Sequence, residues 1–295
     1  MNKAIVTGAN GFIGQNLVHC LAQKGVHVFA VVRDKDKAQN FAEAENVTPI
    51  ICNMNEYSKL SEKLKCEEGF DCLFHLAWQG SAGKLRADWK LQMENVQFSM
   101  ELAEVIPKIS CKRFIAVGTV SEYIVDDILN SGYSSENMIY ALAKAYTHRL
   151  LEIVSKKIKI DYIWAKFSNV YGKGNTSGNL ISYTLNEFSA GHVPTFGPGE
   201  QPYNVDDIVS ALYLLGEIEH HNANDFFLGN GECRKLKDYL YSLANIMDKE
   251  IEIGGRKDDG VIFNSEWFDI TTLQKETGFI PKFTFENGIA DMLKT

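Results

Sequence analysis

The sequence predicts an α/β fold, in which a doubly wound parallel sheet is followed by a smaller C-terminal region. Two observations predict it. Short apolar runs of strand length alternate with stretches of helical periodicity over residues 1–171, as in a parallel sheet with helices on both faces. The first apolar run also ends in a glycine-rich turn that leads directly into a helix.

The composition is that of a soluble globular protein. Hydrophobic residues make up 45% and charged residues 23% of the 295 residues, which is ordinary for such proteins. The net charge of −8 argues against a nucleic-acid-binding surface. No apolar run is long enough to span a bilayer, and the first strand begins too early for a signal peptide. We therefore expect a cytoplasmic protein without nucleic-acid or membrane partners.

Cysteine and histidine do not form a metal-binding pattern. The 6 cysteines include no CxxC pair, and several lie in apolar runs, as buried thiols do. The 7 histidines are scattered, and the adjacent His220 and His221 are expected to face solvent at a helix end. We expect no metal site.

A turn with the sequence TGANGFIG follows the first predicted strand and carries Gly8, Gly11 and Gly14. One glycine permits an otherwise strained backbone, one lets a phosphate approach the main chain, and one lets the helix pack close to the strand. The helix presents unpaired N–H groups and the positive end of its dipole to a pyrophosphate. Since the spacing is GxxGxxG rather than GxGxxG, an ordinary glycine-rich turn is the alternative interpretation.

The second predicted strand, at residues 26–32, ends in a basic tip formed by Arg33, Lys35 and Lys37. In dinucleotide folds an acid at this position binds the ribose 2′-hydroxyl, whereas an arginine accommodates a 2′-phosphate. The tip therefore favours NADP. Because Asp34 interrupts the basic pattern, a solvated charged loop is the alternative.

The third and fourth strands are predicted at residues 47–52 and 71–77, with a polar helical stretch at 56–65 between them. The third strand closes at Asn53. His75 inside the fourth strand is expected to be a packed core histidine rather than a catalyst. Both strands continue the alternation that predicts helices on both faces of the sheet.

A long helix is predicted at residues 84–106. Asn95 within it has modest helix propensity, so we expect it either to be exposed or to make a specific contact. The fifth strand, at 112–118, runs into Thr119 and Ser121. Hydroxyls just past the carboxyl end of a strand lie where open α/β sheets bind ligands.

Tyr140 and Lys144 lie four residues apart at the start of the next predicted helix, so their side chains share one helical face. A lysine ammonium and a bound nicotinamide cation would both favour the phenolate and lower the tyrosine pKa. The tyrosine could then act as a general acid/base. The alternative is an exposed Tyr–Lys pair on an amphipathic helix.

A sixth strand is predicted at residues 161–167, after which residues 172–202 become rich in glycine, asparagine, serine and proline. We expect substrate-binding insertions there, because the regular alternation breaks down. The dinucleotide-binding domain is therefore expected to span 1–171. Residues 172–295 are expected to bind mainly substrate, with 203–228 returning to the first domain.

Several motifs occur in a fixed order along nearly the whole chain: TGANGFIG, LFHLAW, VGTVSEY, YALAK, FSNVYGKG, GPGEQ with VDDIVSAL, and FDITTLQKETGFIPKFTFENGI. This order resembles the extended short-chain dehydrogenase/reductase family, in its NAD-dependent epimerase/dehydratase branch, whose members modify nucleotide sugars. The resemblance implies a Rossmann-type fold. It also implies a homodimer, because the family commonly dimerises through the helices that correspond to residues 84–106 and 137–156.

The resemblance implies roles for particular residues. Tyr140 is expected to be the catalytic acid/base, Lys144 to bond the nicotinamide ribose and lower the tyrosine pKa, and Thr119 to hydrogen-bond the reacting oxygen. Asn169 and Ser121 are expected to contact the substrate. The implied cofactor contacts are Gly8, Asn10, Gly11, Phe12, Ile13, Gly14, Arg33, Asn53, Leu76, Ala77, Phe167, Tyr140 and Lys144.

The chain departs from the family pattern at two places. The family's sugar 4,6-dehydratases carry Thr-Asp-Glu after the fifth strand, whereas this chain has Thr119, Val120 and Ser121. Since the acid that eliminates water is missing there, dehydratase activity is disfavoured. Lys166 stands where many members have arginine, which puts the pyrophosphate contacts in question.

Three functions are compatible with these observations. The first is an NADP-dependent oxidoreductase that reduces a keto group of a nucleotide-activated 4-keto-6-deoxy sugar by hydride transfer. The second is an NAD-dependent nucleotide-sugar epimerase, in which the hydride leaves and returns on one bound cofactor. The third is a non-catalytic dinucleotide-binding sensor, which Thr119, Tyr140 and Lys144 disfavour because a pure binder needs no proton donor.

Overall fold

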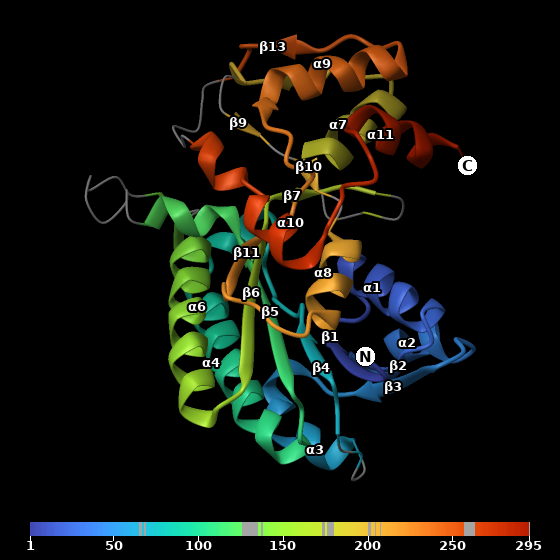
Figure 1. The fold of residues 1–295 in the computed structure, drawn as a ribbon. Helices are drawn as coiled ribbons and strands as arrows, with labels where there is room; N and C mark the ends of the chain where they lie inside the picture. Colours follow the sequence, from blue (N-terminus) through green and yellow to red (C-terminus); the bar gives the residue numbers. More distant parts are fainter. Residues whose placement is uncertain are drawn as a thin grey trace. The chain divides into compact units, whose positions relative to one another are not determined.

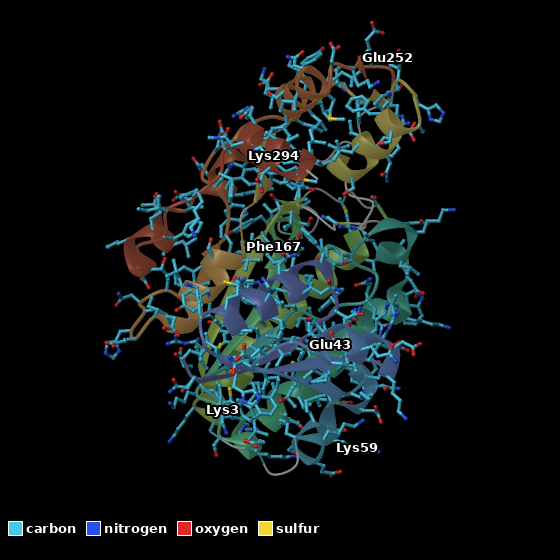
Figure 2. The ribbon with its side chains drawn as sticks, turned by 90° about the vertical axis from the view of Figure 1, so that its right-hand side faces the viewer. Lys3, Glu43, Lys59, Phe167, Glu252 and Lys294 are labelled. Atoms are coloured by element: carbon cyan, nitrogen blue, oxygen red, sulfur yellow. The ribbon has the colours of Figure 1, made fainter. Side chains whose placement is uncertain are left out.

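The chain divides into two compact units. The first unit comprises Met1–Lys166 and Val209–Phe226, and the second comprises Phe167–Ile208 and Phe227–Thr295. Figure 2 shows their side chains, with Lys3, Glu43 and Lys59 in the first unit and Glu252 and Lys294 in the second. The structure, a computed structural model, describes residues 1–64, 67, 69–125, 135–136, 138–172, 175, 180–199, 202–203, 205–206, 208–256 and 263–294.

The first unit is built on a 7-stranded sheet with the strand order β11-β6-β5-β4-β1-β2-β3. The order reverses between β1 and β4, which is the point where open α/β sheets form their ligand crevice. Strands β3, β2, β1, β4 and β5 pair in parallel. The predicted doubly wound α/β fold is thus confirmed. The strands are Lys3–Thr7 (β1), His27–Val32 (β2), Val47–Ile51 (β3), Cys72–His75 (β4), Arg113–Thr119 (β5), Asp161–Phe167 (β6) and Asp225–Phe227 (β11).

Helices cover both faces of this sheet (Figure 1). Phe12–Gln23 (α1) and Val209–Glu217 (α8) pack together on one face, and Trp89–Val105 (α4) and Met138–Ile158 (α6) pack together on the other. The shorter helical segments are Lys35–Ala38 (α2), Gln39–Phe41 (η1), Met54–Lys59 (η2), Leu60–Lys63 (α3), Gly83–Ala87 (η3), Ile106–Ile109 (η4) and Val120–Tyr123 (η5).

The apolar core of the first unit fixes the strand ends at which the site lies. Ile5, Leu73, Phe114 and Trp164, from four neighbouring strands, pack in one cluster with Leu102 of α4. Burying a large apolar side chain stabilises a fold by about 1.5–3 kcal/mol. Because this core is continuous across the sheet, the carboxyl ends of the strands are held in a fixed arrangement.

The second unit is a small α+β body with a core of its own. Its helices α7, α9 and α11 contribute Ile181, Phe188, Tyr239, Leu243 and Phe285 to this core. The helices are Leu180–Ser189 (α7), Leu236–Met247 (α9), Ser265–Phe268 (η6), Thr271–Thr277 (α10) and Phe285–Leu293 (α11). The strand pairs are Asn169–Val170 (β7) with Val205–Asp206 (β10), Pro202–Tyr203 (β9) with Arg234–Lys235 (β12), and Thr195–Phe196 (β8) with Glu252–Ile253 (β13).

The single helix predicted at residues 84–106 is wrong in its first part, because the chain forms two elements there. Gly83–Ala87 is a 3-10 helix, and α4 begins only at Trp89. The Asp88 carboxylate accepts two N–H groups of the first turn, at 3.1 and 3.2 Å, and so fixes the start of α4. Of the insertion expected at 172–202, residues 173–174, 176–179 and 200–201 lie outside the described residues.

The burial and contacts of three polar side chains in the first unit can be compared with the predictions made for them. His75 is a packed core histidine, as predicted, with Nδ1 2.8 Å from the Thr7 hydroxyl. Asn95 makes a specific contact, since its side chain exchanges two hydrogen bonds of 2.9 Å with the backbone of Gln79. The expectation that His221 faces solvent is wrong. Its side chain is only 8% exposed and lies 2.5 Å from a carboxylate oxygen of Asp161, which raises the pKa of the imidazole.

Candidate active site

The glycine turn forms a cradle that side chains would fill. Gly8 has a positive φ of 67°, and a Cβ there would lie 2.8 Å from the backbone nitrogen of Ala77. A Cβ on Gly14 would lie 2.1 Å from the carbonyl oxygen of Gly8. Gly11 precedes α1 and supplies no side-chain cap, so the N–H groups of Phe12 and the residues after it are left for a ligand. These residues fit a dinucleotide pyrophosphate, which needs close backbone approach and a helix N-terminus.

The tip of β2 combines a cation and an anion. Arg33 is largely exposed, and its Nε donates to a carboxylate oxygen of Asp34 at 3.1 Å. Asp34 also accepts the backbone N–H of Lys37 at 2.9 Å, and this hydrogen bond, helped by Arg33, lowers its pKa. The tip therefore offers the arginine that a 2′-phosphate needs beside an acid that could bind a ribose hydroxyl instead.

Four other expected cofactor contacts lie at strand ends. Leu76 and Ala77 follow β4, where Ala77 faces Gly8 across the switch point. Asn53 follows β3 and caps η2, its Oδ1 accepting the Met54 N–H at 2.7 Å. Asn53 thus has a structural role as a helix cap. Phe167 ends β6.

Tyr140 and Lys144 are buried, which excludes the exposed-pair interpretation. They are only 6% and 3% exposed. The Lys144 ammonium donates to the Val117 carbonyl at 2.8 Å and lies 3.8 Å from the centre of the Trp78 ring. The Trp78 ring meets Tyr140 edge-on at 6.2 Å, and the Arg86 guanidinium lies 4.2 Å from the centre of the tyrosine ring. The phenol is therefore enclosed by an indole and a cation.

Burial dominates the acid–base properties of this pair. It raises the pKa of Tyr140 to about 12, opposed by the charge of Arg86 and a hydrogen bond with Thr119. It lowers the pKa of Lys144 to about 7, opposed by the charge of Glu122. In this arrangement burial therefore outweighs the lowering of the tyrosine pKa that was expected from Lys144. The Lys144 ammonium is bonded to a carbonyl of β5, and desolvation of the phenolate outweighs the nearby positive charge.

Thr119 and Ser121 lie at the carboxyl end of β5, as predicted. The Thr119 hydroxyl oxygen accepts the Ser121 N–H at 3.3 Å and so caps η5. The Thr119 side chain also acts to lower the pKa of Tyr140, so the hydroxyl lies near the phenol. Lys166 is 3% exposed, paired with Asp225 at 2.5 Å, and its ammonium lies 4.1 Å from the centre of the Tyr123 ring. The β5–η5 turn is thus braced against β6.

Known proteins resemble this chain in sequence and in fold. The sequence pattern of the NAD dependent epimerase/dehydratase family matches residues 4–228. The chain belongs to this family. The predicted class, nucleotide-sugar-modifying enzymes of the short-chain dehydrogenase/reductase type, is thereby confirmed.

Individual members of the epimerase/dehydratase family resemble the chain over most of its length. CDP-abequose synthase of Salmonella typhimurium is 26% identical over 303 residues, covering 98% of this chain and 97% of the relative. dTDP-6-deoxy-L-talose 4-dehydrogenase (NAD(+)) of Aggregatibacter actinomycetemcomitans is 25% identical over 243 residues, covering 79% and 86%. The solved dTDP-glucose 4,6-dehydratase of Bacillus anthracis, in complex with NAD, has a TM-score of 0.78 at 18% identity, covering 99% and 95%.

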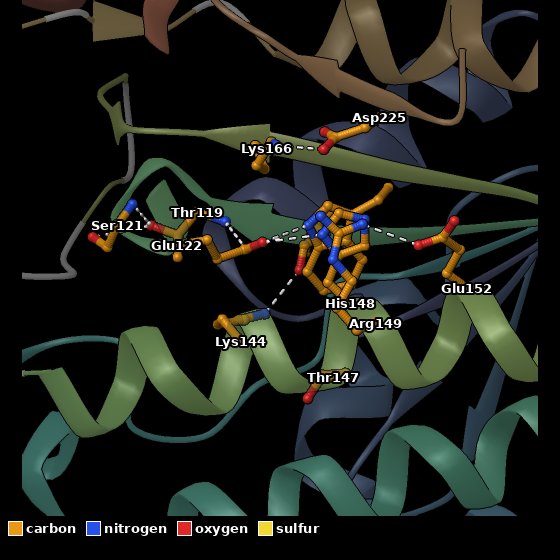
Figure 3. Close-up of polar contacts among 12 residues, drawn as sticks. Thr119, Ser121, Glu122, Lys144, Thr147, His148, Arg149, Glu152, Lys166 and Asp225 are labelled. Atoms are coloured by element: carbon orange, nitrogen blue, oxygen red, sulfur yellow. Dashed lines mark hydrogen bonds and ion pairs between the residues drawn. The ribbon is translucent and has the colours of Figure 1, made fainter. Parts of the chain in front are cut away.

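Sequence reasoning missed five residues around Tyr140 and Lys144. Trp78 and Arg86 enclose Tyr140, whereas Glu122, His148 and Trp164 form a buried polar group near Lys144. Figure 3 shows Glu122, His148 and Lys144 of this arrangement. One signal for Glu122 was present. Thr119 and Glu122 have the spacing of a capping box, in which each side chain accepts the other's backbone N–H. His148 follows Lys144 by four residues on α6, so helical spacing also indicated that it shares this face. Trp78, Arg86 and Trp164 are brought in by tertiary packing, which no local pattern indicates.

The remaining expected site residue, Asn169, lies in the second unit, where β7 pairs in parallel with β10. Among the described residues, no group of three or more His, Cys, Asp or Glu could hold a metal ion. Within that same part of the chain, no helix has the length and apolar character to cross a membrane.

Proposed function

We propose that this protein is an NADP-dependent oxidoreductase that reduces a keto group of a nucleotide-linked sugar, with a 4-keto-6-deoxy hexose as the preferred class. The observation that carries the proposal is the buried Tyr140, which is enclosed by Trp78 and Arg86 and lies close enough to Thr119 for that side chain to lower its pKa. The names of two relatives support the substrate class. One is a CDP-sugar synthase, and the other is a dehydrogenase at position 4 of a dTDP-linked 6-deoxy sugar.

The arrangement suits a carbonyl that becomes an alcohol. A nicotinamide cofactor, held by the glycine turn, supplies the hydride when bound. Tyr140 holds a proton on its phenol oxygen, and Thr119 presents a hydroxyl beside it, so the reacting oxygen meets two fixed donors. Trp78 and Arg86 keep water from the tyrosine ring. We assign substrate binding to Ser121 and, in the second unit, to Asn169.

A cofactor-consumption assay tests the reaction. Mixing the protein with NADPH and a nucleotide-linked 4-keto-6-deoxy sugar should deplete the absorbance of reduced nicotinamide and yield a 4-hydroxy product. Conversion of one sugar isomer into another with NADPH unconsumed would identify an epimerase. Reduction of free ketones alone would contradict the nucleotide-sugar assignment. Dinucleotide binding without any turnover, across a broad set of nucleotide sugars, would favour the sensor.

The NADP preference rests on Arg33. A charge-assisted hydrogen bond to the 2′-phosphate is worth about 1.5–3 kcal/mol, so Arg33→Ala should weaken NADPH binding about 10- to 150-fold and leave NADH binding unchanged. Asp34→Asn is the matched variant, because asparagine keeps the helix cap and releases Arg33 from its ion pair. It should strengthen the NADPH preference. Titration of both cofactors measures these effects, and equal wild-type affinities would shift the assignment to the NAD-dependent epimerase.

We also propose a homodimer formed through α4 and α6. These helices pack together and carry exposed apolar side chains, namely Trp89, Met93, Leu142, Tyr146 and Ile153. Such surfaces mark association sites. Wild type should sediment as a dimer, and Ile153→Glu, at a side chain 64% exposed, should shift it towards monomer. A monomeric wild type would refute the proposal.

Three of the described cysteines, Cys52, Cys72 and Cys111, are buried free thiols. Free thiols are usual in a reducing compartment. We therefore place the protein in the cytoplasm, and fractionation of cells that express it tests the placement.

A further inference from the structure

The Lys144 ammonium is buried next to neutral groups. It donates to the Val117 carbonyl at 2.8 Å and lies over the rings of Trp78 and Trp164, at 3.8 and 5.8 Å from their centres. None of the ion pairs among the described residues includes Lys144. A buried ammonium tends to lose its proton unless a negative charge acts on it. The charge state of Lys144 therefore depends on what surrounds it.

Glu122 and Lys144 both lie next to the indole of Trp164, which donates its N–H to the Glu122 carboxylate at 2.9 Å and whose ring centre is 5.8 Å from the Lys144 ammonium. The Glu122 side chain is 5% exposed and accepts two hydrogen bonds, from the Thr119 N–H at 2.7 Å and from the Trp164 indole N–H at 2.9 Å, and Nδ1 of His148 lies 3.4 Å from it. Figure 3 shows the carboxylate pointing from η5 toward His148 on α6. A Cβ on Gly118 would lie 2.4 Å from the carboxylate. The glycine thus leaves the space that the carboxylate uses.

The other charges around Lys144 do not replace Glu122. His75 on β4 is neutral at working pH, because burial, aided by the charge of Lys144, lowers its pKa to about 3. Tyr140 keeps its proton, and Arg86 on η3 is positive. His148, on the same helix as Lys144, carries no negative charge in either protonation state. Among the described residues, Glu122 is the acid whose charge favours the ammonium.

We propose that Glu122 is a positioning residue of this site: its buried charge keeps Lys144 protonated, and the same carboxylate fixes the Thr119 backbone at the end of β5. One group thus sets both the charge beside the phenol and the place of the hydroxyl. The kinetic consequence rests on the proposed reductase function, whereas the charge of Lys144 can be measured without substrate.

A titration of Lys144 tests the charge directly. In protein labelled with 13C at the lysine Cε, the resonance that disappears in Lys144→Met identifies Lys144. Its pKa, about 7 in wild type, should fall by about one unit or more in Glu122→Gln, because an opposite charge is lost. Glu122→Asp keeps the charge and should stay near wild type. Trp164→Phe, which removes one donor to Glu122 but no charge, is the matched control and should also stay near wild type.

The pH profile of the reduction supplies the second readout. If the reaction needs charged Lys144, the rate falls as pH rises through the lysine pKa, and this fall should move to lower pH in Glu122→Gln. Trp164→Phe should instead lower kcat by a similar factor at every pH. An unchanged lysine pKa in Glu122→Gln overturns the proposal, whether or not the protein turns out to be a reductase. If Glu122→Gln does not fold, Glu122→Asp is used instead. A fall of the Lys144 pKa by about one unit or more in Glu122→Asp, which keeps the negative charge, overturns the proposal equally.

Discussion

Tyr140→Phe should reduce turnover by about 10²- to 10⁴-fold, which is the usual effect of removing a positioned acid. The substitution removes the phenol oxygen and leaves the ring in place. The edge contact with Trp78 and the stacking of Arg86 depend on the ring alone, so the fold should be retained. Rates under single-turnover conditions, together with thermal unfolding and cofactor titration, separate loss of chemistry from loss of structure.

The protonation state of Tyr140 predicts how the rates of reduction and oxidation depend on pH. Its pKa of about 12 means that the phenol is protonated at neutral pH, which is the state that a proton donor needs. Oxidation of an alcohol needs the phenolate, so the oxidative rate should increase with pH while the reductive rate does not. A Tyr140→Phe variant within a few-fold of wild type, in either direction, would refute the assignment of Tyr140 as the acid.

The strands of the large sheet could be predicted from the sequence because each contains a short run rich in apolar residues. β6 spans Asp161–Phe167 as expected, and β5 begins and ends within one residue of its predicted bounds. In a doubly wound sheet helices cover such strands on both faces, so most of their residues are buried and apolar. The local composition therefore reveals where each strand lies. By contrast, hydrophobic spacing alone predicted one continuous helix at residues 84–106. The structure has two elements there, because Asp88 caps the start of α4.

The pairing of Tyr140 with Lys144 could be found from the sequence, but the environment of the pair could not. The spacing of Tyr140 and Lys144 predicts a shared helical face, which is a local property. Their burial comes from Trp78 and Arg86, which lie more than 50 positions earlier in the chain. The sign of the tyrosine pKa shift depends on that burial, and for this reason the local argument gave the wrong direction.

Two substitutions in the glycine turn separate an effect on stability from an effect on cofactor binding. Gly14→Ala should have the larger effect on stability. At Gly14 a Cβ would meet the Gly8 carbonyl oxygen at 2.1 Å and the Ala9 Cα at 2.9 Å. Both are backbone atoms, so α1 would have to move away from β1. Overpacking of this kind costs about 1–3 kcal/mol or more. We expect Gly14→Ala to unfold at a clearly lower temperature and to bind cofactor poorly.

Gly11→Ala is the matched variant in the same turn. Its Cβ would lie 3.2 Å from the Gly8 carbonyl oxygen, its φ of −73° is open to any residue, and the position is exposed. The fold should therefore lose at most a few tenths of a kcal/mol beyond the small cost of alanine at a helix cap. The added methyl group would instead occupy the place where a pyrophosphate approaches the N–H groups of α1. Cofactor affinity should fall while the unfolding temperature stays close to wild type. Wild-type affinity in Gly11→Ala would show that the pyrophosphate is bound elsewhere, and wild-type stability in Gly14→Ala would show that α1 and β1 can separate without cost.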